Sequence, residues 1–248
     1  MRTMRQRPIA LSILLAASFS SPVAAGPPYV SDDAEPTDFR HFEIYLYSDG
    51  ATNRAGTEGS FGIDFNYGAT PDLQLTAVLP IEYSTPAGGA DAMGVGNIEL
   101  AAKYRFLHQS DAGFDVAVFP RVFLASPSAL VGDRNTSLLL PIWLERDWGQ
   151  WTTFGGGGCV LQGGHDADNY CLFGWALARQ VLPNLQIGAE FVHQGAPSRD
   201  ERAMSGFGAG IKYDISEHYH LLAYTGSSIE NAGETERMSW YSSVLFTF

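Results

Sequence analysis

The sequence has few cysteines, few basic residues and, beyond residue 25, no long apolar run. Its two cysteines among 248 residues form no Cys-x-x-Cys pattern, which argues against a redox or zinc motif. No uninterrupted apolar stretch after residue 25 approaches the ~20 residues that a membrane-spanning helix requires. The glycines at 155–158 lack the lysine and the following helix of a phosphate loop. We therefore predict no cofactor and no metal site.

The first 25 residues have the composition of a secretory signal peptide. They contain three arginines, an apolar stretch over 9–19 and small residues at 23–25. The alternative is an N-terminal membrane anchor, but the apolar stretch is shorter than the ~20 residues of a spanning helix. We predict cleavage before Gly26 and therefore an exported protein.

Basic residues are scarcer still once this segment is removed. Three of the 15 basic residues lie in it, so the remaining 223 residues carry 12 basic and 27 acidic residues, a formal charge of −15. Nucleic-acid binding requires a basic face, so this balance argues against a nucleic-acid partner.

Cys159 and Cys171 flank a stretch rich in glycine, histidine and aspartate at 163–168, which is predicted to be a loop. An exported protein meets an oxidising compartment, where disulfides persist. We favour a disulfide near the tip of a hairpin, with two free thiols as the alternative.

The dominant pattern in the rest of the chain is alternation of apolar and polar residues with a period of two. Phe61, Ile63 and Phe65 alternate with glycine and polar residues, and residues 98–106 repeat the pattern. Such repetition predicts an all-β fold, a transmembrane antiparallel up-and-down β-barrel over residues 39–248. A secreted β-sandwich is the alternative. We expect twelve strands, at 40–48, 59–69, 73–84, 96–108, 114–126, 136–147, 151–164, 170–182, 185–195, 204–216, 219–230 and 238–248.

The connections between these strands alternate between short and long. Short turns follow the second, fourth, sixth, eighth and tenth strands, whereas the others are longer, at 49–58, 85–95, 127–135, 165–169, 196–203 and 231–237. Outer-membrane barrels have short periplasmic turns and longer extracellular loops. The alternation therefore places both termini on the periplasmic side.

Aromatic residues near strand ends suit the girdles at the two membrane interfaces. We assign to these girdles Tyr45, Tyr47, Tyr83, Trp143, Trp148, Trp151 and Tyr219. The last strand alternates and ends in Phe248, which resembles the signal read by the outer-membrane barrel assembly machinery.

If the apolar faces meet lipid, the charged residues on the opposite faces line the lumen, because charge on the lipid face costs ~2–4 kcal/mol at the midplane. The candidates are Glu43, Asp64, Glu82, Glu99, Lys103, Arg105, Asp115, Arg121, Glu145, Glu190, Lys212 and Asp214. Their acidic excess favours cations or neutral polar solutes, provided that the lumen is open. The alternative is a network of ion pairs that fills the barrel. Residues 26–38, rich in proline and acid, are either a periplasmic tail or a partial plug, and the looseness of chain termini favours the tail.

Several stretches resemble the outer-membrane transporter family of the MetA pathway of phenol degradation, a group of barrels. The stretches that carry this resemblance are 26–29, 32–38, 41–44, 71–75, 96–106, 140–143, 151–157 and 174–175, with Asn97 where the family has Asp. The resemblance implies a barrel that passes small molecules, including aromatic or apolar ones.

No catalytic constellation is visible. His108 and Ser110 have the His-x-Ser spacing of barrel lipases, but they fall in a predicted periplasmic turn without a third partner. We therefore expect a channel or transporter of the bacterial outer membrane for passive uptake of small-molecule solutes, and not an enzyme. Its other partners are the lipid bilayer and the assembly machinery. The alternative is a non-conducting barrel whose extracellular loops bind ligands.

Overall fold

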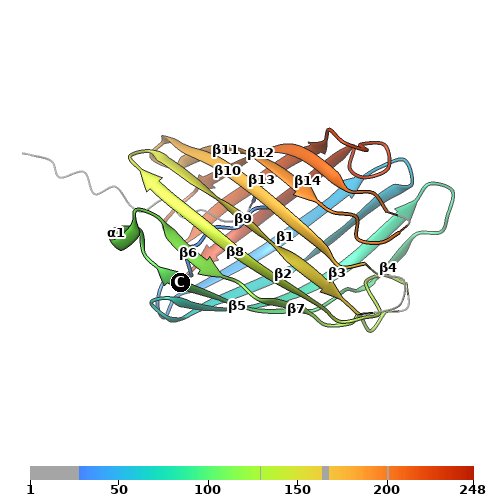
Figure 1. The fold of residues 1–248 in the computed structure, drawn as a ribbon, viewed down its shortest axis with the longest axis horizontal. Helices are drawn as coiled ribbons and strands as arrows, with labels where there is room; N and C mark the ends of the chain where they lie inside the picture. The colour runs from blue at the N-terminus through green and yellow to red at the C-terminus, as the bar shows by residue number, and fades with distance from the viewer. Residues whose placement is uncertain (1–27, 129, 164–167, 200) are drawn as a thin grey trace, which may run out of the picture.

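The computed structural model describes residues 28–248 except 129, 164–167 and 200, so the predicted signal peptide lies outside the described residues. The described chain consists almost entirely of strands, with one short helix (Figure 1). The elements are β1 Phe42–Thr52, β2 Gly56–Thr70, β3 Leu73–Pro86, β4 Ala92–Val95, β5 Glu99–Leu107, α1 Gln109–Ala112, β6 Asp115–Val118, β7 Arg121–Phe123, β8 Ser137–Trp148, β9 Trp151–Gln162, β10 Tyr170–Leu182, β11 Leu185–Gln194, β12 Met204–Asp214, β13 Tyr219–Ser228 and β14 Met238–Thr247.

The strands form one closed antiparallel barrel. Outside β4 to β7, each strand pairs with its neighbours in chain order, and β1 pairs with β14 from Glu43–Thr247 to Thr52–Met238. β4 and β5 both pair with β3, while β6 and β7 both pair with β5 and β8. The fourteen strand segments therefore make a wall of twelve. The predicted all-β, twelve-stranded barrel is confirmed.

The structure corrects two of the predicted strands. The strand expected at 96–108 begins only at Glu99, and the short segment β4 lies in the predicted loop 85–95. Between β4 and β5, the Asn97 amide donates to Glu82 Oε1 (3.1 Å) and the Asn97 side chain accepts from the Asp133 amide (2.6 Å). The strand expected at 114–126 is interrupted between β6 and β7, where Pro120 has no N–H to donate to a ladder.

The first predicted long loop is also corrected, because most of 49–58 is strand. Asp49 pairs with Ser60 and Ala51 with Glu58, so that only 53–55 connect β1 to β2. The Asp49 carboxylate accepts from the Ser60 hydroxyl (2.6 Å), which helps to extend the ladder. The short turns gather with α1 and the C-terminus at one end of the barrel, on the left in Figure 1.

An apolar belt surrounds the outside of the barrel. Leu46, Ile63 and Leu79 lie side by side on β1, β2 and β3, with 47%, 43% and 54% of their surfaces exposed. Closure leaves no unpaired sheet edge, so this surface suits hydrocarbon, which cannot satisfy free backbone groups. Within the described residues, no helix is both long enough and apolar enough to cross a membrane.

The girdle assignment is wrong for four of its seven aromatic residues. Tyr45 and Trp143 are buried, and Tyr47 and Tyr83 line the interior. Alternation decides this, because Leu46 points outward and its neighbours at 45 and 47 must therefore point inward. The remaining three, Trp148, Trp151 and Tyr219, are exposed near the short turns.

Cys159 and Cys171 lie directly opposite each other on β9 and β10 and form a disulfide. This bond ties the two strands together near the end of their shared ladder, next to the connection at 163–169. It therefore stabilises one hairpin of the wall and leaves the interior free of cysteine.

Candidate functional site: the barrel lumen

The barrel encloses a cavity of about 1320 Å³ that reaches between strands far apart in the sequence. Its wall comes mainly from the inward faces of β1, β2, β3, β13 and β14. The opposite side is closed by residues 28–38, which we call the N-terminal strap. Figure 1 shows the strap, in blue, running between the strands. We call the cavity the open half of the interior. The filled half is the space that the strap occupies against β8, β10, β11 and β12.

Acidic side chains dominate the lining of the cavity. Twelve carboxylate residues contribute to it, against three basic residues, Lys103, Arg121 and Lys212. The walls are surrounded by protein and lipid, so that fields of one sign are focused into the space between them. The cavity therefore attracts cations and repels anions.

Four of these carboxylates are held by neutral donors. Glu43 accepts from the Tyr45 hydroxyl (3.1 Å), Asp49 from Ser60, Asp64 from the Asn66 amide (2.9 Å) and Glu82 from the backbone of Asn97. Among the ion pairs of the described residues, none includes any of these four. Within the described residues, no basic side chain therefore competes with a solute for these four carboxyl groups.

Another acidic residue of the lining, Glu99, is neutralised by Arg121. The guanidinium donates from Nε to Oε1 (2.7 Å) and from Nη2 to Oε2 (2.9 Å). The Arg121 guanidinium also lies 5.3 Å from the centre of the Phe119 ring. This two-bond geometry fixes both side chains against the wall. Glu99 therefore contributes less to the field of the cavity than its charge implies.

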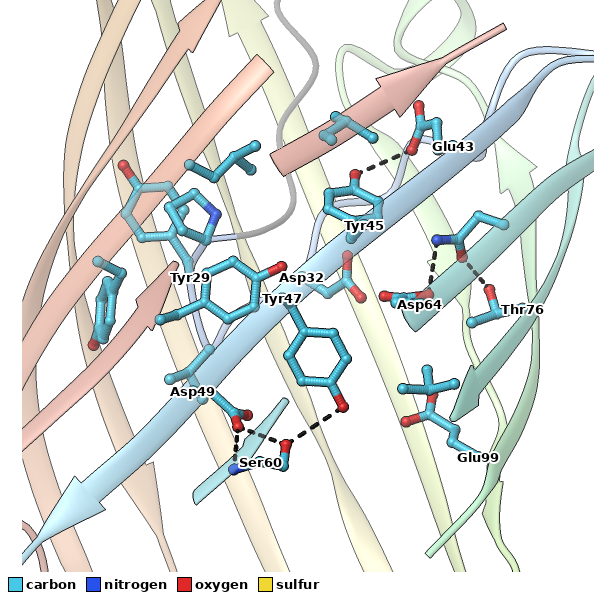
Figure 2. A pocket seen from close by; sticks show the side chains of 18 of the residues that line it. Tyr29, Asp32, Glu43, Tyr45, Tyr47, Asp49, Ser60, Asp64, Thr76 and Glu99 are labelled. Carbon is cyan, nitrogen blue, oxygen red and sulfur yellow. Dashed lines mark hydrogen bonds between the residues drawn. The ribbon is translucent and has the colours of Figure 1, made fainter. Parts of the chain in front are cut away.

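Tyrosines form the other surface of the open half (Figure 2). Tyr45 and Tyr47 project from β1, and Tyr241 of β14 stacks on Tyr47 with ring centres 6.2 Å apart. Figure 2 shows Tyr47 pointing toward Ser60 and Asp49. A tyrosine presents an apolar ring face together with a hydroxyl group. The open half thus combines aromatic faces with carboxylates.

The strap is bonded to the wall along its whole length. Glu190 of β11 accepts from the amides of Val30 (2.9 Å) and Ser31 (3.0 Å), one at each carboxylate oxygen. Glu145 of β8 accepts from the Ala34 amide (3.1 Å), and Gln74 of β3 accepts from the Thr37 amide (2.8 Å). The strap therefore crosses from one side of the barrel to the other.

Lys103 holds the middle of the strap. Its ammonium lies 2.9 Å from Asp32 Oδ1 and 2.6 Å from Asp33 Oδ1, and it donates to the Glu35 carbonyl (3.3 Å). Burial raises the pKa of the Glu35 carboxyl, and the nearby Arg105 guanidinium partly opposes that shift. These contacts hold residues 28–38 against the inner wall of the barrel.

The structure divides the twelve residues predicted to line the lumen into three groups. Seven line the cavity, namely Glu43, Asp64, Glu82, Glu99, Lys103, Arg121 and Lys212. Glu145 and Glu190 bind the strap. The other three lie nearer the short turns, where Arg105 lies 3.9 Å from Asp115 and Asp214 bonds His220 (2.6 Å).

Several residues of the site had not been singled out from the sequence. Asp49 and Glu58 belong to the cavity but fell in the predicted loop 49–58. Tyr29 contacts Phe154 and Tyr224, with ring centres 5.5 and 6.1 Å apart, and Gln74 holds Thr37. The only sequence signal for this group is the conjunction of Pro28 and Tyr29 with the acidic residues that follow.

Comparison with solved structures identifies proteins that share this fold. No family model and no curated protein sequence matches the chain. Among solved structures, an outer membrane channel from Pseudomonas putida F1 is similar, with a TM-score of 0.72 and 14% identity over 87% of this chain and 98% of that one. The fold is that of a bacterial outer-membrane β-barrel. The predicted location in the bacterial outer membrane is confirmed, and the apolar belt provides the surface that this location requires.

A second similar structure is the KdgM porin, with a TM-score of 0.57 and 9% identity over 83% of this chain and 99% of that chain. The same porin in complex with disordered oligogalacturonate gives a TM-score of 0.55 and 10% identity over 84% and 99% of the two chains. At such identities the likeness concerns the fold of the barrel and not its solute.

Proposed function

We propose that this protein is an outer-membrane channel for the passive uptake of small molecules. The observation that carries the proposal is the acid-lined cavity of about 1320 Å³ inside a closed barrel with an apolar exterior. Solutes would move down their gradient through the open half, past the tyrosines and the carboxyl groups of Glu43, Asp49, Asp64 and Glu82. The outer-membrane channel and porin with similar folds support the proposal.

The lining favours small cations and neutral polar molecules. Rings of acidic side chains select cations, and aromatic faces attract both cations and other rings. The resemblance to the transporter family of the MetA pathway supports aromatic solutes within this class. An oligogalacturonate is a polyanion, so we propose that this channel differs from the KdgM porin in its solute.

The test is the reversal potential of the refolded protein in a planar bilayer under a salt gradient. The wild type is expected to be cation-selective, and the double variant Asp49→Asn with Asp64→Asn less so, because two ionisable carboxyl groups leave the cavity. Asp111→Asn on the exposed helix α1 is the matched control and should leave the reversal potential unchanged. Equal selectivity of all three proteins would show that these carboxylates do not line the path.

Organic ions extend this test to the proposed solute class. Benzylammonium and benzoate have similar sizes and opposite charges, so their relative permeabilities separate charge from shape. We expect benzylammonium to permeate faster in the wild type and this preference to shrink in the double variant. A preference for benzoate would contradict the proposal.

A second candidate function is a non-conducting barrel whose extracellular loops bind ligands. The observation that favours it is the strap, which fills one half of the interior. A correctly folded protein, judged by a gel shift on boiling in SDS, that gives no conductance under any voltage would select this function.

We propose no catalytic role. His108 pairs with Asp72 (3.3 Å), and Ser110 bonds Asp111, so the His-x-Ser spacing forms no nucleophile and base pair. His193 and Ser205 do meet on the outer face of β11 and β12 (2.8 Å), but Glu230 bonds Ser205 rather than His193. The pair therefore lacks the acid that orients a catalytic histidine.

Phe248 is proposed as the element that the barrel assembly machinery reads. Its side chain is exposed, and its backbone exchanges two 3.0 Å hydrogen bonds with Phe42. Phe248→Ala is expected to reduce the amount of barrel in the outer membrane without changing the stability of barrel refolded in detergent. An unchanged amount would refute this role.

A further inference from the structure

We propose that the N-terminal strap, residues 28–38, is a displaceable gate, and that the wall carries a dedicated site for its backbone. The inference deepens the proposed channel function, on which it rests. In the docked state the strap leaves only the open half of the lumen as a path. When it leaves the wall, the filled half joins that path.

The wall recognises the strap mainly through its backbone. Glu190 and Glu145, each with 2% of its surface exposed, direct carboxylates at amides of the strap, and Gln74 does the same with its carbonyl group. A buried carboxylate is costly unless donors satisfy it. The docked strap supplies such donors to both carboxylates, two amides to Glu190 and one to Glu145.

The shape of the wall matches the strap as well. A Cβ added at Gly210 of β12 would lie 2.9 Å from Pro28 and from the ring of Tyr29, and its three nearest atoms all belong to the strap. A Cβ added at Gly174 of β10 would meet Ser31. Glycine at these two wall positions makes room for the strap.

The strap is connected to the barrel by a turn that serves as a hinge. Arg40 adopts a φ of 65°, and its amide donates to the Gly68 carbonyl (2.7 Å) at the end of β2. The His41 amide donates to the Asp38 carbonyl (2.9 Å). These bonds anchor the strap at the short-turn end, independently of the contacts with Glu145 and Glu190. The strap can therefore leave the wall without unfolding β1.

Water in the lumen limits the cost of release. Once the strap leaves, Glu145, Glu190 and Lys103 face an aqueous space, where carboxylates and ammonium groups are solvated. What is lost is the set of charge-assisted hydrogen bonds to the strap, each of modest net strength, together with the ring contacts of Tyr29 with Phe154 and Tyr224. A reversible equilibrium between docked and released strap follows.

The first test replaces residues 28–38 by eleven residues of glycine and serine in the full chain. This variant keeps the chain length and removes the contacts with the wall. We expect larger single-channel steps than in the wild type, because the filled half opens. Equal steps in both conducting proteins would overturn the gate and leave the channel function standing. No conductance from either protein would overturn both.

The second test locks the strap with a disulfide, and it does not depend on the first variant folding. The Cβ built at Gly174 lies 3.4 Å from the Cβ of Ser31, close to the ~3.5–4.5 Å span of a disulfide. Ser31→Cys with Gly174→Cys is made in a background with Cys159→Ser and Cys171→Ser, which prevents mispairing. That background alone is the control.

The oxidised lock is expected to show only the small steps of the docked state, and reduction should restore the openings of the control. Identical records before and after reduction would show that the strap never leaves the wall during conduction, which overturns the gate.

A third test weakens the docked state without abolishing it. Glu190→Gln removes the negative charge that the amides of Val30 and Ser31 share. We expect the ratio of open to closed time to rise about tenfold. Glu201→Gln, at an exposed residue of the connection between β11 and β12 that does not line the cavity, is the matched control.

Discussion

Replacing Ile63 by arginine tests whether the outer face of the barrel lies in hydrocarbon. Ile63 is the central residue of β2, seven residues from Gly56 and from Thr70. At ~3.4 Å per residue and a tilt of about 40°, it lies roughly 18 Å from each end of the strand, measured along the membrane normal. This distance exceeds half the ~25 Å height of the apolar band. Its cross-strand neighbours Leu46 and Leu79 are exposed and apolar as well. Ile63 thus lies close to the midplane.

An arginine at the midplane costs ~2–4 kcal/mol, whereas one near the interface costs ~0–1 kcal/mol. Ile63→Arg should therefore lower the free energy of unfolding from lipid vesicles by about 2–4 kcal/mol. Thr70→Arg, at the exposed end of the same strand, is the control and should cost under about 1 kcal/mol. The measurement is guanidinium unfolding of both variants beside the wild type. Equal costs at the two positions would refute a lipid-facing β2.

Three further predictions concern the interior, the hairpin disulfide and the hinge. Arg121→Gln should lower the free energy of unfolding by about 1–3 kcal/mol, because it leaves the buried Glu99 carboxylate without its two charge-assisted hydrogen bonds. Adding Glu99→Gln should recover part of this loss. Strictly additive costs of the two substitutions in a double-mutant cycle would contradict direct coupling. Replacing Cys159 and Cys171 by serine should lower the free energy of unfolding by about 2–3 kcal/mol, because the disulfide closes a loop over a separation of 12 residues. An unchanged denaturation midpoint would show that the disulfide does not stabilise the barrel. Arg40→Val should be about 1–2 kcal/mol less stable than Arg40→Gly, because a β-branched residue tolerates positive φ poorly, and equal midpoints would argue against the turn at Arg40.

The fold follows from the sequence because a barrel wall repeats one simple rule. Alternation at Phe61, Ile63 and Phe65 fixes which face meets lipid, and the same rule applied to every strand gives the wall of twelve. The rule fails where a side chain takes over a ladder bond. Asn97 binds the segment around Asp133, so β5 begins only at Glu99. Pro120 withholds a donor, so the strand expected at 114–126 breaks although its apolar pattern continues.

The orientation of the aromatic residues was harder to predict than that of the charged ones. A carboxylate has one favourable side in a membrane wall, whereas a tyrosine suits an interface or a polar lumen equally well. Counting two positions from Leu46 would have directed Tyr45 and Tyr47 inward, but the residue type alone favours a girdle.

The strap could not be derived from the sequence. Its prolines remove periodicity, and its partners Gln74, Glu145 and Glu190 lie between 37 and 160 residues away along the chain. A glycine such as Gly210 gives a signal only after the strap is known to lie on it. Composition could show that residues 26–38 are not a strand, and only the tertiary contacts show where residues 28–38 lie.

The most direct test of the central claim is single-channel recording of the refolded full chain in a planar bilayer under a salt gradient. An acid-lined lumen predicts discrete steps with a reversal potential on the cation-selective side, reduced by the double replacement of Asp49 and Asp64 with asparagine. Anion-selective steps, or a correctly folded barrel that stays silent even when residues 28–38 are replaced, would contradict it.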